Sequence, residues 1–282
     1  MKQLSVILSF LILSFLGCKN DDINAPIPAY LTINDISVKA RNGSGTASDN
    51  ITDAKVFIND QSLGTFQLPA SIPIQTTGAV KLKIRGVILN RGNSNDKRDY
   101  PFYTDYEENI VFEKEVEVER NPRVEYFPSV DFDSPWSGED FESGVNFEYN
   151  PNSEAVFVRE TDPNDVFEGN ASGKAVLTSD QEFFEAWIPT FSDIPRNGQA
   201  VYLEMNYKST HLFAISIYAN NQTSQNRVVF LRPSTEWKKA YIEIGEIFSL
   251  ISAANNYTIA IGFTKSKGEE AKLLIDNVNL GH

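Results

Sequence analysis

The strongest constraint on the fold is a regular alternation of apolar and polar residues, which recurs along most of the chain. Clear examples are the stretches at residues 80–85, 115–119 and 203–208. An alternation with period two places one face of a β-strand in a core and the opposite face in solvent. The stretches are short, and turn-forming Asn, Gly and Pro residues separate them. The sequence therefore predicts an all-β protein built from antiparallel β-sandwiches, with one helical turn at residues 246–254.

A change in composition near residues 120–130 marks a predicted boundary between two domains. A charged strand ends there, and the pairs Asn121-Pro122 and Phe127-Pro128 follow. The chain has 282 residues, of which 41% are hydrophobic and 12% aromatic, so it is long and apolar enough for two cores. We expect a first domain over residues 30–125 and a second domain over residues 130–282.

The first residues of the chain have the pattern of an export signal. Residues 1–17 combine a short basic start with an apolar stretch, which is shorter than the ~20 apolar residues of a membrane-spanning helix. The only cysteine, Cys18, follows directly, so the chain has no second thiol for a disulfide. Residues 15–18 resemble a bacterial lipobox. This resemblance implies that the signal peptide 1–17 is removed, that Cys18 carries diacylglyceryl and N-acyl lipid, and that residues 18–29 form a lipidated tether.

Three charged residues directly after this cysteine bear on the location. Lys19, Asp21 and Asp22 resemble the surface-export signal of Bacteroidota lipoproteins. The resemblance implies a lipid-anchored protein of the outer membrane, with the extracellular face as the expected side. A solvated tether would have the same composition, so these residues alone leave the leaflet open.

The charge and the residue types of the chain argue against several function classes. A formal net charge of −13 argues against nucleic acid as a partner, because nucleic-acid sites are basic. The only histidines are His211 and His282, and the sequence has no Gly-x-Ser-x-Gly motif and no glycine-rich phosphate loop. We therefore expect a protein that is not an enzyme and requires no cofactor. A glycoside-active enzyme stays a remote alternative, because a pair of carboxylates suffices for that chemistry.

The first domain carries no pattern that indicates chemistry. Residues 53–74 and 80–92 resemble the small immunoglobulin-like or PEGA-like modules found near the anchors of cell-envelope lipoproteins. The resemblance implies a β-sandwich that spaces or braces the domain after it. Aromatic residues cluster at positions 100–106, and we expect them to fill the end of this sandwich core. A docking surface for the second domain or for a partner is the alternative.

The second domain contains four motifs in a characteristic order. They are EDFESG at residues 139–144, GNASGKAVLTS at 169–179, STEWKKAYIEI at 234–244 and KLLIDNVNL at 272–280. In this order they resemble the galactose-binding-like jelly roll, which is the fold of many carbohydrate-binding modules. The resemblance implies a jelly-roll β-sandwich. It does not by itself assign a function, because this fold has many.

The same resemblance implies a structural calcium ion. Its ligands would be the carboxylates of Glu142 and Asp276 together with backbone carbonyls, since calcium takes about six to eight oxygen ligands. The alternative is that Asp276 hydrogen-bonds to backbone near a turn and that Glu142 is solvated. The residues leave both alternatives open.

Strand alternation also selects a candidate ligand face on the second domain. In the strands around residues 183–191, 212–219 and 238–244, the apolar neighbours are expected inward, which leaves one aromatic side chain of each strand outward. The predicted ligand face consists of Trp187, Tyr218, Tyr241, Glu185 and Asn206, with Glu204 and Lys208 beside them. Such a face would suit a sugar ring or the aromatic anchors of a protein interface, and a neighbouring domain could also cover it.

The sequence thus predicts a non-catalytic binding protein of the bacterial envelope. Our main hypothesis is a binding or assembly module for an envelope protein complex. The alternative hypothesis is a glycan-binding lipoprotein that captures a polysaccharide with the jelly-roll face. Both hypotheses attach the protein to the outer membrane through the lipid on Cys18.

Overall fold

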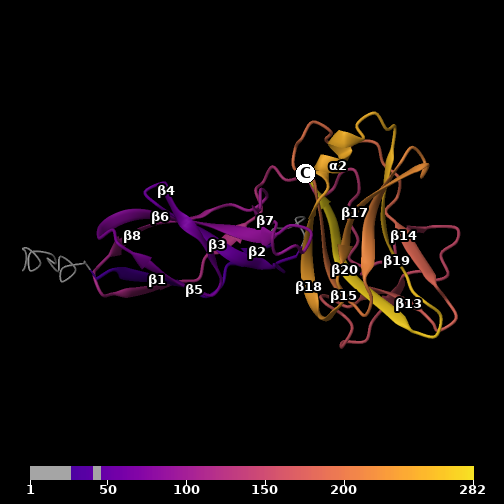
Figure 1. The fold of residues 1–282 in the computed structure, drawn as a ribbon, viewed down its shortest axis with the longest axis horizontal. Coiled ribbons are helices and arrows are strands. Elements are labelled where there is room, and N and C mark those ends of the chain that lie inside the picture. The colour runs from indigo at the N-terminus through magenta and orange to yellow at the C-terminus, as the bar shows by residue number, and fades with distance from the viewer. Residues whose placement is uncertain (1–26, 41–45) are drawn as a thin grey trace, which may run out of the picture.

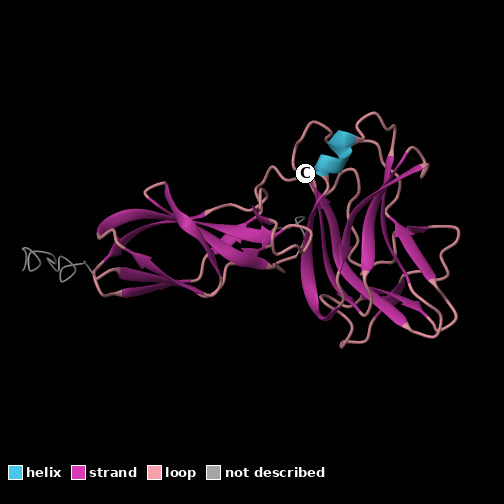
Figure 2. Ribbon diagram, viewed as in Figure 1, coloured by secondary structure: helices cyan, strands magenta, loops and turns pink. Residues whose placement is uncertain are grey.

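The computed structural model describes residues 27–40 and 46–282. This part of the chain is almost entirely β-structure with one short α-helix (Figure 2), so the predicted all-β class is confirmed. None of the helices in the described ranges is long and apolar enough to cross a membrane. The predictions that fall outside the described residues concern the signal peptide 1–17, Cys18, Lys19, Asp21 and Asp22.

The first domain is a β-sandwich. Its strands are β1 (Ala29–Ile33), β2 (Ser37–Lys39), β3 (Ile51–Ile58), β4 (Gln61–Gln67), β5 (Ala70–Ile74), β6 (Gly78–Leu89), β7 (Lys97–Asp99), β8 (Tyr106–Phe112), β9 (Glu117–Arg120) and β10 (Arg123–Glu125). One sheet has the order β4-β3-β6-β7, and β8 also pairs with β6. The facing layer consists of the sheet β5-β1-β9 and the pair β10-β2.

Two strand pairs of the first domain differ from the predicted antiparallel arrangement. β1 pairs with β9 in parallel, and β2 pairs with β10 in parallel. Alternation along a single strand gives its buried face but carries no information on the direction of its neighbour, so the sequence could not reveal this. The result is that each of the first two strands of the domain lies beside one of its last two strands and runs the same way.

The second domain is a jelly-roll β-sandwich, as the sequence predicted. Its elements are β11 (Glu148–Tyr149), β12 (Val158–Glu160), β13 (Ser172–Leu177), β14 (Phe183–Trp187), β15 (Tyr202–Ser209), β16 (Phe213–Ala219), β17 (Ser224–Leu231), β18 (Ser234–Glu243), α2 (Gly245–Leu250), β19 (Tyr257–Thr264) and β20 (Ala271–Gly281). The strands form two sheets with the orders β12-β13-β20-β15-β18 and β11-β14-β19-β16-β17. We call the first the near sheet and the second the far sheet, by their positions relative to the first domain.

The core of the second domain lies between the near and far sheets. Alternation along β15 turns Leu203 and Met205 inward, and alternation along β16 turns Ile215 and Ile217 inward, and all four are fully buried. Helix α2 closes one end of the sandwich, where the Phe248 ring packs 4.9 Å from the Tyr257 ring. Burial of such apolar area is the main stabilising contribution to this fold.

One end of the first domain packs against one face of the second domain. In Figure 1 the first domain abuts the side of the second domain where β18 and β15 lie, whereas β14 and β19 lie on the opposite side. The first described residues lie at the end of the first domain that points away from this junction. Two tyrosines of the near sheet, Tyr202 and Tyr241, belong to the same hydrophobic cluster as the core of the first domain. The near sheet is therefore sandwiched between two cores.

Candidate functional site

The structure divides the predicted ligand face between the two sheets of the second domain. Tyr241 and Asn206 lie on β18 and β15 of the near sheet. Trp187 and Glu185 lie on β14, and Tyr218 lies on β16, all in the far sheet. These residues therefore form two separate faces rather than one.

The prediction that Tyr241 is exposed is wrong. Its side chain does point away from the core of the second domain, but the first domain covers it, and only 1% of its surface is exposed. The Tyr241 hydroxyl lies 2.8 Å from the Tyr103 hydroxyl and accepts a hydrogen bond from the Asn50 backbone N–H at 3.3 Å. The Tyr100 ring packs against the Tyr241 ring at 4.8 Å. Tyr241 is thus a contact between domains and is not available to a ligand.

Asn206 is buried in the same junction, so its assignment to a ligand face is also wrong. The Ser48 hydroxyl of the first domain donates a hydrogen bond to Asn206 Oδ1 at 3.0 Å. Next to it, Lys239 and Glu204 form an ion pair of 2.6 Å, and their side chains are 2% and 1% exposed. Charged groups that are this deeply buried require a partner, and here each charge has one.

Tyrosines of the first domain complete this buried network. The Tyr126 hydroxyl donates to Glu204 Oε2 at 2.7 Å, and the Tyr100 hydroxyl donates to Glu204 Oε1. Lys239 Nζ donates to the Tyr126 hydroxyl at 3.0 Å. Burial raises the pKa of Tyr100 and Tyr126 well above the usual value, so both stay protonated and keep donating.

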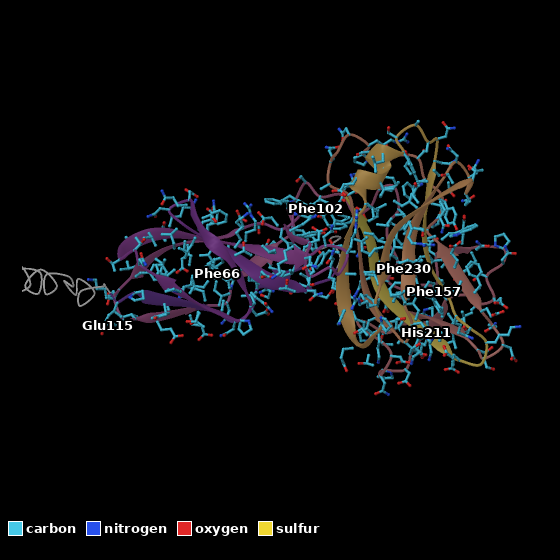
Figure 3. All side chains as sticks on the ribbon, in the orientation of Figure 1. Phe66, Phe102, Glu115, Phe157, His211 and Phe230 are labelled. Atoms are coloured by element: carbon cyan, nitrogen blue, oxygen red, sulfur yellow. The ribbon has the colours of Figure 1, made fainter. Side chains whose placement is uncertain are left out.

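The aromatic cluster at residues 100–106 has both of the roles that the sequence offered, because Tyr100, Phe102 and Tyr103 belong to the core cluster of the first domain and also contact the second domain. The rings of Tyr100 and Phe102 lie 5.0 Å and 5.5 Å from the ring of Tyr202 on the near sheet. The cluster therefore docks the first domain onto the second. Figure 3 labels Phe102 at this junction.

The far sheet keeps its outward aromatic residues accessible. Trp187 and Tyr218 are partly exposed, and their rings meet edge to face at 6.1 Å. Glu185 holds both of them, because Trp187 Nε1 donates to its carboxylate at 2.8 Å and the Tyr218 hydroxyl donates at 3.2 Å. Asn150 Nδ2 donates to the same carboxylate at 2.9 Å. Burial and the Glu185 charge raise the pKa of Tyr218 to about 12, which keeps its hydroxyl protonated.

A groove of about 400 Å³ opens over this sheet. Its floor consists of the small residues Ala214, Ser216 and Gly262 from the central strands β16 and β19. A Cβ atom on Gly262 would lie 2.5 Å from the Phe184 carbonyl oxygen, so this position requires glycine. Larger side chains stand around the floor: Phe183, Glu185, His211, Tyr218, Gln225, Arg227 and Phe230.

Sequence reasoning missed the part of the groove that β17 provides. Phe230 is 47% exposed, and the Arg227 guanidinium lies 4.7 Å from the centre of its ring. The pairing of β16 with β17 shifts register between Ile215 and Ser216. Because of this bulge, residues on both sides of it face outward, and the stretch Arg-Val-Val-Phe shows no period-two alternation in the sequence. The available signal was a large aromatic residue in a strand at the edge of a sheet.

The two residues predicted to bind calcium line one cavity of about 730 Å³ at the other side of the second domain. The Glu142 carboxylate accepts hydrogen bonds from the backbone N–H groups of Asn170 and Ala171 at 2.7 Å and 3.1 Å. The Asp276 carboxylate accepts hydrogen bonds from the Ser172 hydroxyl at 2.6 Å and the Asn277 N–H at 2.8 Å. Burial raises the pKa of Asp276 to about 6.

These contacts engage both carboxylates without a metal. Among the residues that the structure describes, no group of three or more His, Cys, Asp or Glu side chains is arranged to hold a metal ion. For Asp276 the Asn277 N–H matches the alternative of a backbone hydrogen bond, whereas Glu142, which that alternative left solvated, also accepts hydrogen bonds from the Asn170 and Ala171 backbone. Calcium binding stays a prediction.

His211, which is labelled in Figure 3, also lines the groove. Its Nε2 lies 3.3 Å from Glu269 Oε2, and its Nδ1 lies 3.1 Å from the Thr210 hydroxyl. The expectation that the protein is not an enzyme stays a prediction.

Comparisons with known proteins give structural neighbours only. No protein-family model matches the sequence, and no curated protein matches it. A structure reported for the promiscuous specificity of carbohydrate-binding modules from the β-sandwich superfamily aligns over 89% of this chain and 98% of its own, with 12% identity and a TM-score of 0.41.

Two further neighbours align with the chain over half its length. The family 11 carbohydrate-binding module from Clostridium thermocellum, in complex with a β-1,3-1,4-mixed-linked tetrasaccharide, has 14% identity and a TM-score of 0.34 over 50% of this chain and 92% of its own. An exo-β-agarase has 13% identity and a TM-score of 0.35 over 50% of this chain and 24% of its own. Similarity at this level assigns neither a family nor a ligand to the chain.

Proposed function

We propose that this protein is a glycan-binding protein whose second domain holds a saccharide in the groove over the far sheet. The observation that carries the proposal is that Tyr218 and Phe230 line the groove as accessible rings around a floor of small residues, while Trp187 packs edge to face against Tyr218. The C–H faces of a pyranose ring pack on aromatic side chains, and a floor of small residues leaves space for the ring. Ligand sites combine such apolar walls with a few well-placed polar groups.

The polar groups of the groove suit sugar hydroxyls. The donors to Glu185 within the described chain are neutral, namely Asn150, Trp187 and Tyr218. None of these donors is a cation, and the carboxylate oxygens have acceptor capacity left for hydrogen bonds from sugar hydroxyl groups. Gln225 and Arg227 on β17 provide donors on the opposite side of the floor.

The test is binding to polysaccharides in affinity gel electrophoresis. Phe230→Ala and Tyr218→Ala should each weaken binding about 10-fold or more, because each removes an aromatic surface that lines the groove. Tyr30→Ala is the control, since Tyr30 is an aromatic residue of the first domain with comparable exposure to Phe230. Unchanged retardation of both groove variants would contradict the proposal, as would the absence of retardation of the parent protein in every gel.

Assembly with an envelope protein complex remains the second hypothesis. Accessible Trp and Tyr residues also serve as anchors in protein interfaces. A purified protein partner that binds the parent but not Trp187→Ala, without any glycan binding, would select assembly instead.

We further propose that the chain is lipid-anchored through Cys18 on the outer surface of a bacterial outer membrane. The position of the first described residues supports this, because an anchor before them would hold the groove at the far end of the molecule from the membrane. Cys18→Ala should abolish labelling by a fatty-acid analogue. Replacing Lys19, Asp21 and Asp22 with Ala should retain labelling and remove protease accessibility in intact cells. Persistent labelling of Cys18→Ala would contradict the anchor.

A further inference from the structure

A second cavity, of about 670 Å³, lies where the two domains and the two sheets of the second domain converge. One wall is the end of β17 and the start of β18, which are the edge strands of the far and near sheets. The opposite wall is the turn at residues 89–94 of the first domain. Arg91 and Gly92 in this turn have positive φ angles, and Gly92 lies close enough to Leu231 that a Cβ atom would touch it at 3.7 Å. The junction thus holds the cavity in a fixed shape.

The charge of this cavity is opposite to that of the whole chain. Arg91, Arg232, Lys238 and Lys239 line it, and the described residues in its lining include no Asp or Glu, although the chain has a net charge of −13. Lys239 is neutralised by Glu204, and Arg91 donates to the Glu243 carbonyl oxygen at 2.8 Å. Arg232 and Lys238 are exposed, and neither forms an ion pair with any residue that the structure describes. Two cations are therefore free to meet an anion.

A tyrosine hydroxyl in the same cavity has no hydrogen-bond partner among the described residues. Tyr207 is 7% exposed and lines the cavity, and its hydroxyl makes no hydrogen bond within the described chain. Burial raises the pKa of Tyr207, so the hydroxyl stays protonated and is available as a donor. Because Tyr207 lines the cavity, its hydroxyl can donate to a ligand group that binds there.

We propose that this cavity binds the anionic group of an acidic glycan, either the carboxylate of a uronic acid or a sulfate ester. Arg232 provides a planar set of donors that matches such groups, Lys238 adds a second charge, and the Tyr207 hydroxyl adds a neutral donor. Phe230 lines both this cavity and the groove over the far sheet, so one saccharide chain reaches both sites across its ring. This inference rests on the proposed glycan binding and adds the class of glycan.

The test compares polymers that differ only in charge. Polygalacturonate is compared with its methyl ester for the carboxylate, and carrageenan with chemically desulfated carrageenan for the sulfate. The parent protein should bind at least one charged polymer about 10-fold more tightly than its neutral counterpart, with a preference that falls as salt is raised. The double variant Arg232→Gln/Lys238→Gln should lose this preference and keep the affinity for the neutral polymer.

Two further variants separate a specific site from net charge. Lys114→Gln/Lys267→Gln removes the same two charges from exposed positions outside the cavity, and it should bind like the parent. Tyr207→Phe keeps the ring and should weaken binding of the charged polymer several-fold with no change for the neutral one. Equal binding of charged and neutral polymers by the parent and the double variant would overturn this inference and leave the proposed glycan binding in the groove unaffected. No binding of any of the four polymers by the parent would overturn the groove and this inference together.

Discussion

The two outer faces of the second domain have the same sequence pattern, an aromatic residue beside a carboxylate, but opposite environments in the folded protein. On the near sheet, Tyr241 stands beside the carboxylate of Glu204, and on the far sheet, Tyr218 stands beside the carboxylate of Glu185. The first domain covers the near face, and a buried lysine neutralises Glu204. The far face stays open, and neutral groups alone donate to Glu185 among the described residues.

The difference shows how an acidic aromatic face becomes either structural or available for binding. A covered carboxylate needs a counter-charge, because the low polarity of the interior makes an unpaired charge very costly. Glu185 is also only 7% exposed, but it borders the open groove and its donors within the described chain are neutral, so its oxygens keep acceptor capacity for a ligand. The presence of a buried cation thus distinguishes the junction from the groove.

The largest effect is expected from removing the cation of the junction. Lys239→Ala leaves Glu204 buried without its counter-charge, and we expect a loss of about 3 to 5 kcal/mol in the free energy of unfolding. Glu185→Gln on the far face keeps an acceptor oxygen and leaves no buried counter-charge unpaired, so it should cost only about 1 kcal/mol. Chemical denaturation of both variants measures the difference. Equal losses would show that the two faces do not differ as described.

The loss in Lys239→Ala should be specific to the unpaired charge. The double variant Glu204→Gln/Lys239→Met keeps the volume and removes both charges, so it should recover a large part of the lost stability. A double variant as unstable as Lys239→Ala would assign the loss to packing instead.

A smaller effect is expected from the tyrosine hydroxyls of the two faces. Tyr241→Phe leaves the Asn50 N–H without its partner and the Tyr103 hydroxyl with only the Tyr126 hydroxyl at 3.3 Å, which should cost about 1 to 3 kcal/mol in this buried junction. Tyr218→Phe loses a hydrogen bond that water can replace, so it should cost at most about 0.5 kcal/mol. Thermal melts of this matched pair provide the measurement. A larger loss of stability for Tyr218→Phe than for Tyr241→Phe would contradict the assignment of the near sheet as the buried face.

The outward direction of these side chains was predictable from the sequence, but whether another part of the chain covers them was not. Alternation along β14, β16 and β18 correctly placed Trp187, Tyr218 and Tyr241 on the side away from the domain core. Whether another part of the chain covers that side depends on residues more than a hundred positions away, such as Tyr103 and Tyr126, and period-two patterns carry no information on such contacts. The aromatic cluster at 100–106 was visible as a cluster, yet a core and a docking surface have the same composition.

The site itself was predictable only in part. Glu185 was selected because it alternates with buried residues, and the structure adds why it matters, since it holds both rings. Phe230 was missed because the bulge in β17 breaks the pattern on which the prediction depended. The interdomain cavity could not be predicted, because its walls come from separate domains.

The carboxylate of Asp276 provides a pH-dependent contrast within the near sheet. Unlike Glu204, it has no cation, and burial raises its pKa from 3.8 to about 6. The folded state therefore holds this proton more tightly than the unfolded chain does, and the stabilisation is complete below pH 3.8 and lost as the pH rises through about 6. We expect the stability of the parent relative to Asp276→Asn to fall between about pH 4 and pH 7. A flat difference over that range would contradict the raised pKa.

Calcium is expected to produce the smallest effect at neutral pH. If Glu142 and Asp276 bind the ion, millimolar calcium should raise the melting temperature of the parent by mass action and leave Asp276→Asn unchanged. The shift should shrink below about pH 6, because protonated Asp276 is a poor ligand. An equal melting temperature of the parent in chelator and in calcium would contradict calcium binding by the second domain.

The most direct measurement of the contrast between the two faces is amide hydrogen exchange with and without a neutral oligosaccharide. The oligosaccharide is taken from the polymer that retards the parent most strongly in the gels. We predict slower exchange in β14, β16 and β17 of the far sheet and unchanged exchange in β15 and β20 of the near sheet. Protection confined to the near sheet or to the first domain would contradict glycan binding in the groove.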